Sequence, residues 1–83
     1  MAETDEILLE AFAKTLRKKR NALGLSQEEL AHRAGVSMRY ISLLESRQHQ
    51  PSLSTLRGLC GGLGVSMKEF VSDLEEALPV KKA

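Results

Sequence analysis

The sequence predicts a compact all-α domain of five helices, in which the second and third form a helix-turn-helix. Three observations support this prediction. Apolar residues recur at helical spacing, serines stand where helices should begin, and glycines stand where they should end. The 83 residues are enough for one domain, 1–83, with a small core.

The first helix is expected over about 5–23, because apolar residues recur there every four positions. Leu23 completes this stripe, whose other members are Leu8, Phe12 and Leu16. Acidic residues at the beginning of the segment and basic residues near its end match the helix dipole.

The second and third helices are predicted within the motif 26–46. Ser26 is a good N-cap, and Glu29 three residues later completes a capping box. Gly35 ends this helix, because glycine adopts the left-handed conformation without a Cβ clash. Ser37 then caps the next helix, so only a tight turn separates the two. This arrangement is the sequence form of a helix-turn-helix.

Ser52 is expected to cap a fourth helix that runs to about Leu63. Four leucines are expected to face inward, and its interior carries three glycines that each cost about 0.8–1 kcal/mol relative to alanine. This helix is therefore weak or held by close packing. The leucines are Leu53, Leu56, Leu59 and Leu63, and the glycines are Gly58, Gly61 and Gly62.

A fifth helix is predicted over about 66–78, where Ser66 and Glu69 form a second capping box. It stops before Pro79, and the tail 79–83 is expected to be frayed.

Charge is distributed unevenly along the chain. Residues 1–12 hold four acids and no base, and residues 51–83 hold four of each. Residues 13–50 hold eight lysines and arginines against three acids, a net charge of +5. The basic charge therefore falls on the predicted helix-turn-helix and the segment before it, as expected of a protein that binds nucleic acid.

Several other classes of protein are not indicated. A single cysteine, Cys60, allows no intrachain disulfide and fits a reducing compartment, and a small buried hydrophobe is its favoured role. His32 and His49 have no third metal ligand spaced with them. No nucleophile–base pair or paired carboxylates suggest an enzyme, and no cofactor is implied. No apolar run approaches the roughly 20 residues of a membrane span, and no signal-peptide pattern opens the chain, so a soluble cytoplasmic protein is expected.

The segment SQEELAHRAGVSMRYISLLE resembles the helix-turn-helix of the Cro/C1-type, or XRE-like, family of phage repressors and restriction–modification controller proteins. The resemblance covers about 12–71 and includes two later helix starts, Pro51-Ser52-Leu53 and Leu63-Gly64-Val65-Ser66. It implies a repressor-like domain that binds double-stranded DNA as a homodimeric transcription regulator. The matching residues within the motif are Gln27, Ala31, Gly35, Ile41, Leu44 and Glu45.

The resemblance also implies which residues touch DNA. Helix 37–46 enters the major groove, and Arg39 is the best candidate to bind guanine through two hydrogen bonds. Base reading is expected from Met38, Arg39, Ser42 and Leu43, and phosphate contact from Gln27, Ser37, Tyr40 and Arg47. Glu28 and Glu29 resemble positions where some relatives touch RNA polymerase, although solvation of Glu28 and capping by Glu29 also explain them.

Two contacts between elements are also expected. Arg20 and Glu45 should form a partly buried ion pair, because Glu45 lies near the core-facing side of its helix and the family carries a similar pair. An apolar stripe on the fifth helix should form the dimer interface, and it consists of Met67, Val71, Leu74 and Leu78. The alternative is that the first helix covers this stripe with Ile7 and Leu9.

A protein-interaction module of the same fold that does not bind DNA is the alternative function, since fold does not fix function. Such a module should present a broad apolar or acidic patch on helix 37–46. Arg39 between Ser37 and Ser42, within a basic segment, favours DNA instead.

Overall fold

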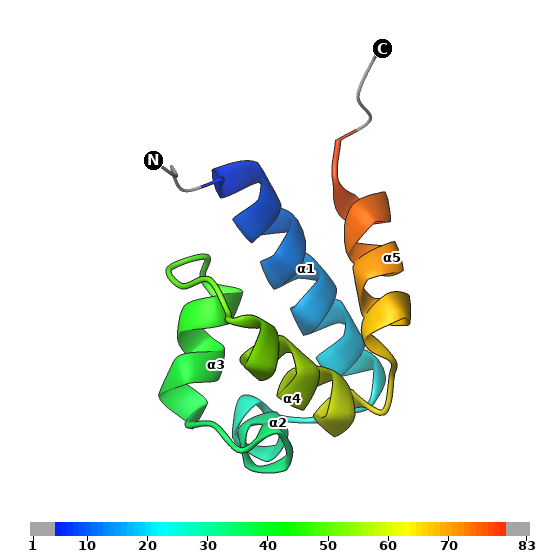
Figure 1. Ribbon diagram of the computed structural model, residues 1–83. Helices are drawn as coiled ribbons and strands as arrows, with labels where there is room; N and C mark the ends of the chain where they lie inside the picture. The colour runs from blue at the N-terminus through cyan, green and yellow to red at the C-terminus, as the bar shows by residue number, and fades with distance from the viewer. Residues whose placement is uncertain (1–4, 80–83) are drawn as a thin grey trace.

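The computed structural model describes residues 5–79, and its helices follow one another in the predicted order (Figure 1). The prediction of a five-helix, all-α fold with the helix-turn-helix in the second and third helices is confirmed. Residues 80–83 of the expected tail lie outside the described residues. The helices are α1 (Glu6–Ala22), α2 (Gln27–Ala34), α3 (Met38–Glu45), α4 (Leu53–Leu63) and α5 (Met67–Ala77).

A side chain caps the beginning of every one of these helices. Asp5 caps α1 by accepting a hydrogen bond from the Leu8 amide, and serines 26, 37, 52 and 66 cap the others. At Ser26 the expected capping box is complete, because the Ser26 amide also donates to Glu29 Oε1 at 2.8 Å. At Ser66 the hydroxyl accepts a hydrogen bond from the Glu69 backbone amide, which is one of the two bonds of the expected capping box. The second bond, from the Ser66 amide to the Glu69 carboxylate, is not formed among residues 5–79.

The turn between α2 and α3 is as short as predicted. Gly35 ends α2 with a φ of 77°, in the left-handed region that glycine enters without strain. Ser37 already caps α3, and Figure 1 shows the two helices leaving the turn in different directions. The turn therefore fixes how α3 is presented relative to α2.

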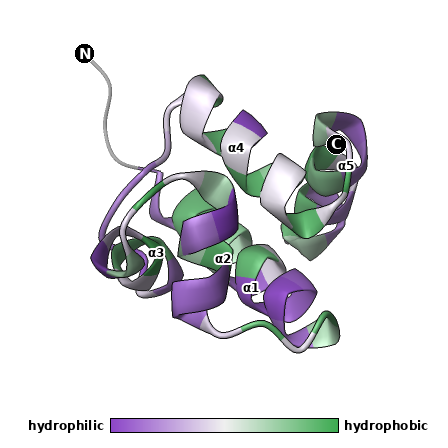
Figure 2. Ribbon diagram, turned by 90° about the horizontal axis from the view of Figure 1, so that it is seen from below, coloured by the Kyte–Doolittle hydropathy of each residue, from purple (hydrophilic) through white to green (hydrophobic). Residues whose placement is uncertain are grey.

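The core is built from the inner faces of all five helices. The Phe12 and Phe70 rings meet with their centroids 5.5 Å apart, which joins α1 to α5. Burying one large apolar side chain stabilises a protein by about 1.5–3 kcal/mol, so the cluster of buried side chains from the five helices dominates the folding energy. In Figure 2, α2 lies between α3 and α4, and it packs against both. The cluster contains Phe12, Leu16, Leu30, Ala31, Ile41, Leu44, Leu59, Cys60, Leu63 and Phe70. No helix within residues 5–79 is long and apolar enough to cross a membrane.

Two leucines that were expected to face inward are exposed. Leu23 is 51% exposed, because α1 ends before it and the chain buries Leu25 instead. Leu53 is 76% exposed. The leucines that follow it lie three, three and four residues apart. Because a helical turn takes about 3.6 residues, each step of three residues rotates the side chain to about 60° short of a full turn. Leu53 therefore lies on the flank of α4, away from buried Leu59 and Leu63.

The glycines of α4 are explained by close packing against α2. A Cβ atom at Gly58 would lie 3.0 Å from the carbonyl oxygen of Ala34. At Gly62 it would lie 3.1 Å from the Cβ of Arg33. Gly61 faces outward, and a Cβ atom there would meet nothing within 4 Å. Two of the three glycines therefore lie where a Cβ atom would press tightly against α2, and the third does not.

This difference can be tested with a matched pair of substitutions. Gly61→Ala should raise the free energy of unfolding by about 0.5–1 kcal/mol, because alanine restricts the unfolded chain. Gly58→Ala should lower it by about 1–3 kcal/mol, because the methyl group must displace backbone of α2. Urea denaturation measures both. Equal stability of the two variants would show that close packing does not explain Gly58.

Candidate nucleic-acid interface

The outer face of α3 presents most of the predicted base readers to solvent. Ile41, Leu44 and Glu45 form the buried inner face of this helix. Arg39 is exposed on the opposite side, and among residues 5–79 no hydrogen bond or ion pair engages its guanidinium. Met38 and Ser42 are exposed as well, and Leu43 is half-buried beside them. Three of the four predicted residues are therefore accessible to a large partner.

A buried ion pair connects α3 to α1. Arg20 donates from Nε to Glu45 Oε2 at 2.7 Å and from Nη2 to Glu45 Oε1 at 2.9 Å. The Arg20 and Glu45 side chains are only 12% and 5% exposed. The hydrogen bonds to Glu45 raise the pKa of Arg20 and outweigh burial, which lowers that pKa. The structure thus brings together the two residues that the sequence suggested as a pair.

Further bonds extend this pair into a network. The remaining terminal nitrogen of Arg20, Nη1, donates to the carbonyl oxygen of Leu25 at 2.8 Å. The side-chain amide of Gln27 donates from Nε2 to Glu45 Oε1 at 3.1 Å, and Arg17 Nη2 donates to the backbone carbonyl of Glu45 at 2.8 Å. The Glu45 carboxylate therefore links α1, α2 and α3 at a single point.

The residues predicted to contact phosphate lie near the two ends of α3. The Ser37 hydroxyl accepts from the Tyr40 amide at 3.0 Å, and both residues lie at the beginning of the helix. Gln27 reaches the other end through its bond to Glu45, and exposed Arg47 follows that end directly. Arg47 Nη1 lies 3.8 Å from Glu10 Oε1 of α1.

Sequence reasoning missed two partners of these residues. The ring of His49 meets the ring of Tyr40 edge-on, with centroids 5.2 Å apart, and Glu10 pairs with Arg47. Each contact joins residues from different elements, so no local pattern in the sequence signals it.

The α5 stripe is covered only in part. Met67 and Leu74 are half-buried against the core, Leu78 is half-buried, and Val71 is 42% exposed. α1 packs against α5. Of the two residues named for that cover, Leu9 is buried and Ile7 is exposed.

Neither a reactive thiol nor a metal site is indicated within residues 5–79. Cys60 is buried as expected, and this burial raises the pKa of its thiol more than the nearby Lys19 charge lowers it. Within residues 5–79, no three His, Cys, Asp or Glu side chains are grouped so that they could hold a metal ion.

The energetic role of the Arg20–Glu45 pair can be measured. Glu45→Gln should lower the free energy of unfolding by about 3–5 kcal/mol, because it leaves a buried guanidinium without its counter-charge. Asp73→Asn is the matched control. Asp73 is 46% exposed and pairs with Lys19, which is 17% exposed. Because water reaches the Asp73 carboxylate, loss of its charge should cost under about 1 kcal/mol. A cost for Glu45→Gln as small as that of the control would reject the structural tie.

Comparison with known proteins places this architecture in a family. A family model described as helix-turn-helix matches residues 16–70. The uncharacterized HTH-type transcriptional regulator y4dJ of Sinorhizobium fredii (strain NBRC 101917 / NGR234) is 42% identical over 65 residues, which cover 78% of this chain and 79% of that protein. The immunity repressor protein of Bacillus phage phi105 is 37% identical over 60 residues. Those residues cover 72% of this chain but only 40% of the repressor.

Solved structures agree with this assignment. The crystal structure of the wild-type restriction–modification controller protein C.Esp1396I superimposes with a TM-score of 0.81 at 28% identity. The match covers 90% of this chain and 95% of the controller protein. The resemblance seen in the sequence is thereby confirmed, and so is the expectation of a regulator rather than an enzyme. The chain belongs to the Cro/C1-type (XRE-like) helix-turn-helix family of DNA-binding transcription regulators.

Proposed function

We propose that the protein is a homodimeric transcription regulator that binds a palindromic operator and reads its sequence with α3 in the major groove. The observation that carries the proposal is the exposed outer face of α3, whose one arginine has no partner within residues 5–79. A helix of this width fits the major groove, where each base pair displays a distinct pattern of donors and acceptors.

Each of the four proposed base readers of α3 suits a particular contact with the bases. The Arg39 guanidinium can donate to both O6 and N7 of one guanine. Ser42, one turn further along the same face, offers a hydroxyl that can donate or accept. Met38 and Leu43 lack strong donors, so they contact thymine methyl groups. Direct readout then comes from these four residues.

Phosphate contacts at both ends of α3 position the helix. Ser37 and Tyr40 bind the backbone at its beginning, and Arg47 and Gln27 bind it at its end. Because Glu45 already orients the side-chain amide of Gln27, Gln27 binds phosphate from a fixed position. These contacts add affinity that depends on salt but carry no sequence information.

Two copies are needed because one small domain reads only a few base pairs. The exposed part of the α5 stripe, Val71, lies on the surface where a second copy packs, with Met67, Leu74 and Leu78 around it. A two-fold axis at α5 would present both copies of α3 to half-sites about 34 Å apart.

As a transcription regulator the protein acts in the cytoplasm, where RNA polymerase is a further candidate partner. Glu28 at the start of α2 is exposed and available for such a contact, whereas the Glu29 carboxylate is engaged in the capping box.

Base reading by Arg39 is tested with a site selected from a random DNA pool. Arg39→Ala should weaken binding to that site by about 1–3 kcal/mol and relax the preference at one base position. Lys68→Ala is the control, because it removes the same charge from exposed α5 surface. Fluorescence anisotropy at fixed salt measures both variants. Unchanged affinity and preference in Arg39→Ala would contradict the assignment, and a pool with no enriched site would favour the interaction module.

The dimer interface is tested by placing a charge on the stripe without disturbing the core. Val71→Glu should convert a dimer into a monomer at tens of micromolar, because the carboxylate would be buried between the two copies. Ser72→Glu, an exposed neighbour of Val71, should leave the dimer intact. Sedimentation measures both. A wild-type monomer at this concentration, or a Val71→Glu dimer that binds the palindrome normally, would exclude this interface.

A further inference from the structure

Arg47 occupies a backbone conformation that favours glycine. Its φ is 64°, and it is the single non-glycine residue with positive φ within residues 5–79. The Arg47 amide bonds to the Leu44 carbonyl at 3.3 Å, and the Gln48 amide bonds to the Leu43 carbonyl at 2.9 Å. These two bonds close α3 in the manner of a Schellman motif, where glycine is the usual residue. An arginine here carries backbone strain, which directs attention to the function of its side chain.

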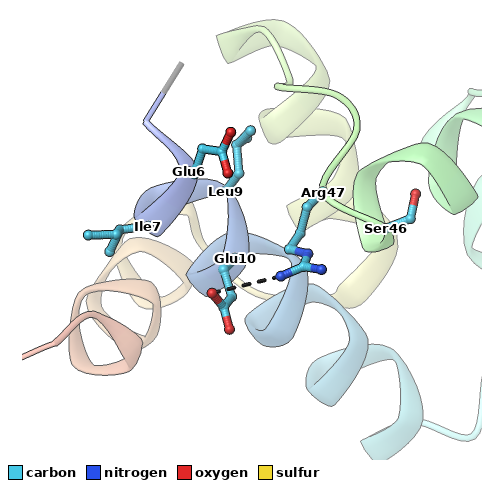
Figure 3. Close-up of a pocket in the computed structure, with 6 residues that line it drawn as sticks. All are labelled: Glu6, Ile7, Leu9, Glu10, Ser46 and Arg47. Atoms are coloured by element: carbon cyan, nitrogen blue, oxygen red, sulfur yellow. Dashed lines mark ion pairs between the residues drawn. The ribbon is translucent and has the colours of Figure 1, made fainter. Parts of the chain in front are cut away.

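The Arg47 side chain turns toward α1 and meets Glu10 (Figure 3). The closest nitrogen and oxygen are 3.8 Å apart, and the two side chains are 58% and 60% exposed. A hollow of about 310 Å³ adjoins the pair between the first turns of α1 and the end of α3. A second hollow of about 500 Å³ also borders both side chains and extends toward Lys14 and Arg17. Solvent therefore reaches the pair, which is joined by one long contact.

We propose that Glu10 is an internal competitor that DNA phosphate must displace from Arg47. The proposal rests on the proposed function, because it requires Arg47 to contact phosphate when α3 lies in the major groove. A carboxylate and a phosphate attract the same guanidinium, so an Arg47 side chain that moves toward a phosphate gives up its contact with Glu10. Each binding event then exchanges one anion for another. Glu10 thereby lowers the affinity for every DNA sequence without altering base preference.

The size of the effect follows from the exposure of the pair. Surface ion pairs contribute about 0.2–1 kcal/mol, which corresponds to a factor of about 1.5–5 in an equilibrium constant. Glu10 therefore moderates binding and does not abolish it.

The test measures DNA affinity by fluorescence anisotropy on two duplexes, a selected operator and an unrelated sequence. Glu10→Gln should tighten binding to both by about 1.5- to 5-fold. Glu6→Gln is the matched control, because Glu6 is exposed on the same hollow, one turn earlier, and loses the same charge. Glu6→Gln should produce a smaller gain, which reports only the general effect of removing negative charge near DNA.

A double variant separates competition from that general effect. Arg47→Gln should weaken binding to both duplexes and flatten the salt dependence by about one unit. With Arg47 absent, adding Glu10→Gln should produce no more than the gain seen for Glu6→Gln. Urea unfolding of each variant shows that the fold is intact.

Competition is overturned if Glu10→Gln leaves affinity unchanged or weakens it, or if its gain persists undiminished beside Arg47→Gln. Failure of the proposed function looks different, since the wild-type protein would then enrich no site and Arg39→Ala would change nothing.

Discussion

The carboxylate of Glu45 is the constraint on which the arrangement of α1, α2 and α3 depends. An ionised carboxylate that is 5% exposed is tolerated only when donors surround it, and two other elements must approach to supply them. Arg20 comes from α1 and Gln27 from the first position of α2. No buried side-chain nitrogen or oxygen within residues 5–79 lacks a hydrogen-bond partner. The direction of α3 is therefore set by electrostatics as well as by apolar packing.

Packing fixes α2 from its other side. Gly58 and Gly62 allow α4 to approach the backbone of α2 more closely than side chains would permit. α2 is thus held between a polar contact at its first residue, Gln27, and a close backbone contact at its last, Ala34. The two contacts are physically independent, yet both act on the helix that precedes α3. A short helix of eight residues gains a defined position in this way, which its own hydrogen bonds could not provide.

Local chemistry explains which features could be predicted from the sequence. Helix beginnings follow from serine hydroxyls and helix ends from glycine, because these signals act within four residues. The prediction that Leu53 and Leu23 face inward is wrong, because spacing alone does not show where a stripe leaves the core. The pairing of Arg20 with Glu45 could be inferred from placement and resemblance. The contacts of Arg47 with Glu10 and of Tyr40 with His49 could not, since they depend on how exposed side chains of separate elements meet.

Two arginine–glutamate ion pairs lie at the end of α3, and they differ in burial. The Arg20–Glu45 pair is buried, whereas the Arg47–Glu10 pair is exposed. Glu45 is enclosed and bound through both carboxylate oxygens, so its partner Arg20 has no freedom to leave. Glu10 is open to water and holds Arg47 by one loose contact, so that arginine can be transferred to another anion at little cost. Burial rather than residue type therefore distinguishes the fixed pair from the loose one. The enclosed pair fixes the geometry of α3, whereas the open pair leaves the Arg47 guanidinium accessible to another anion.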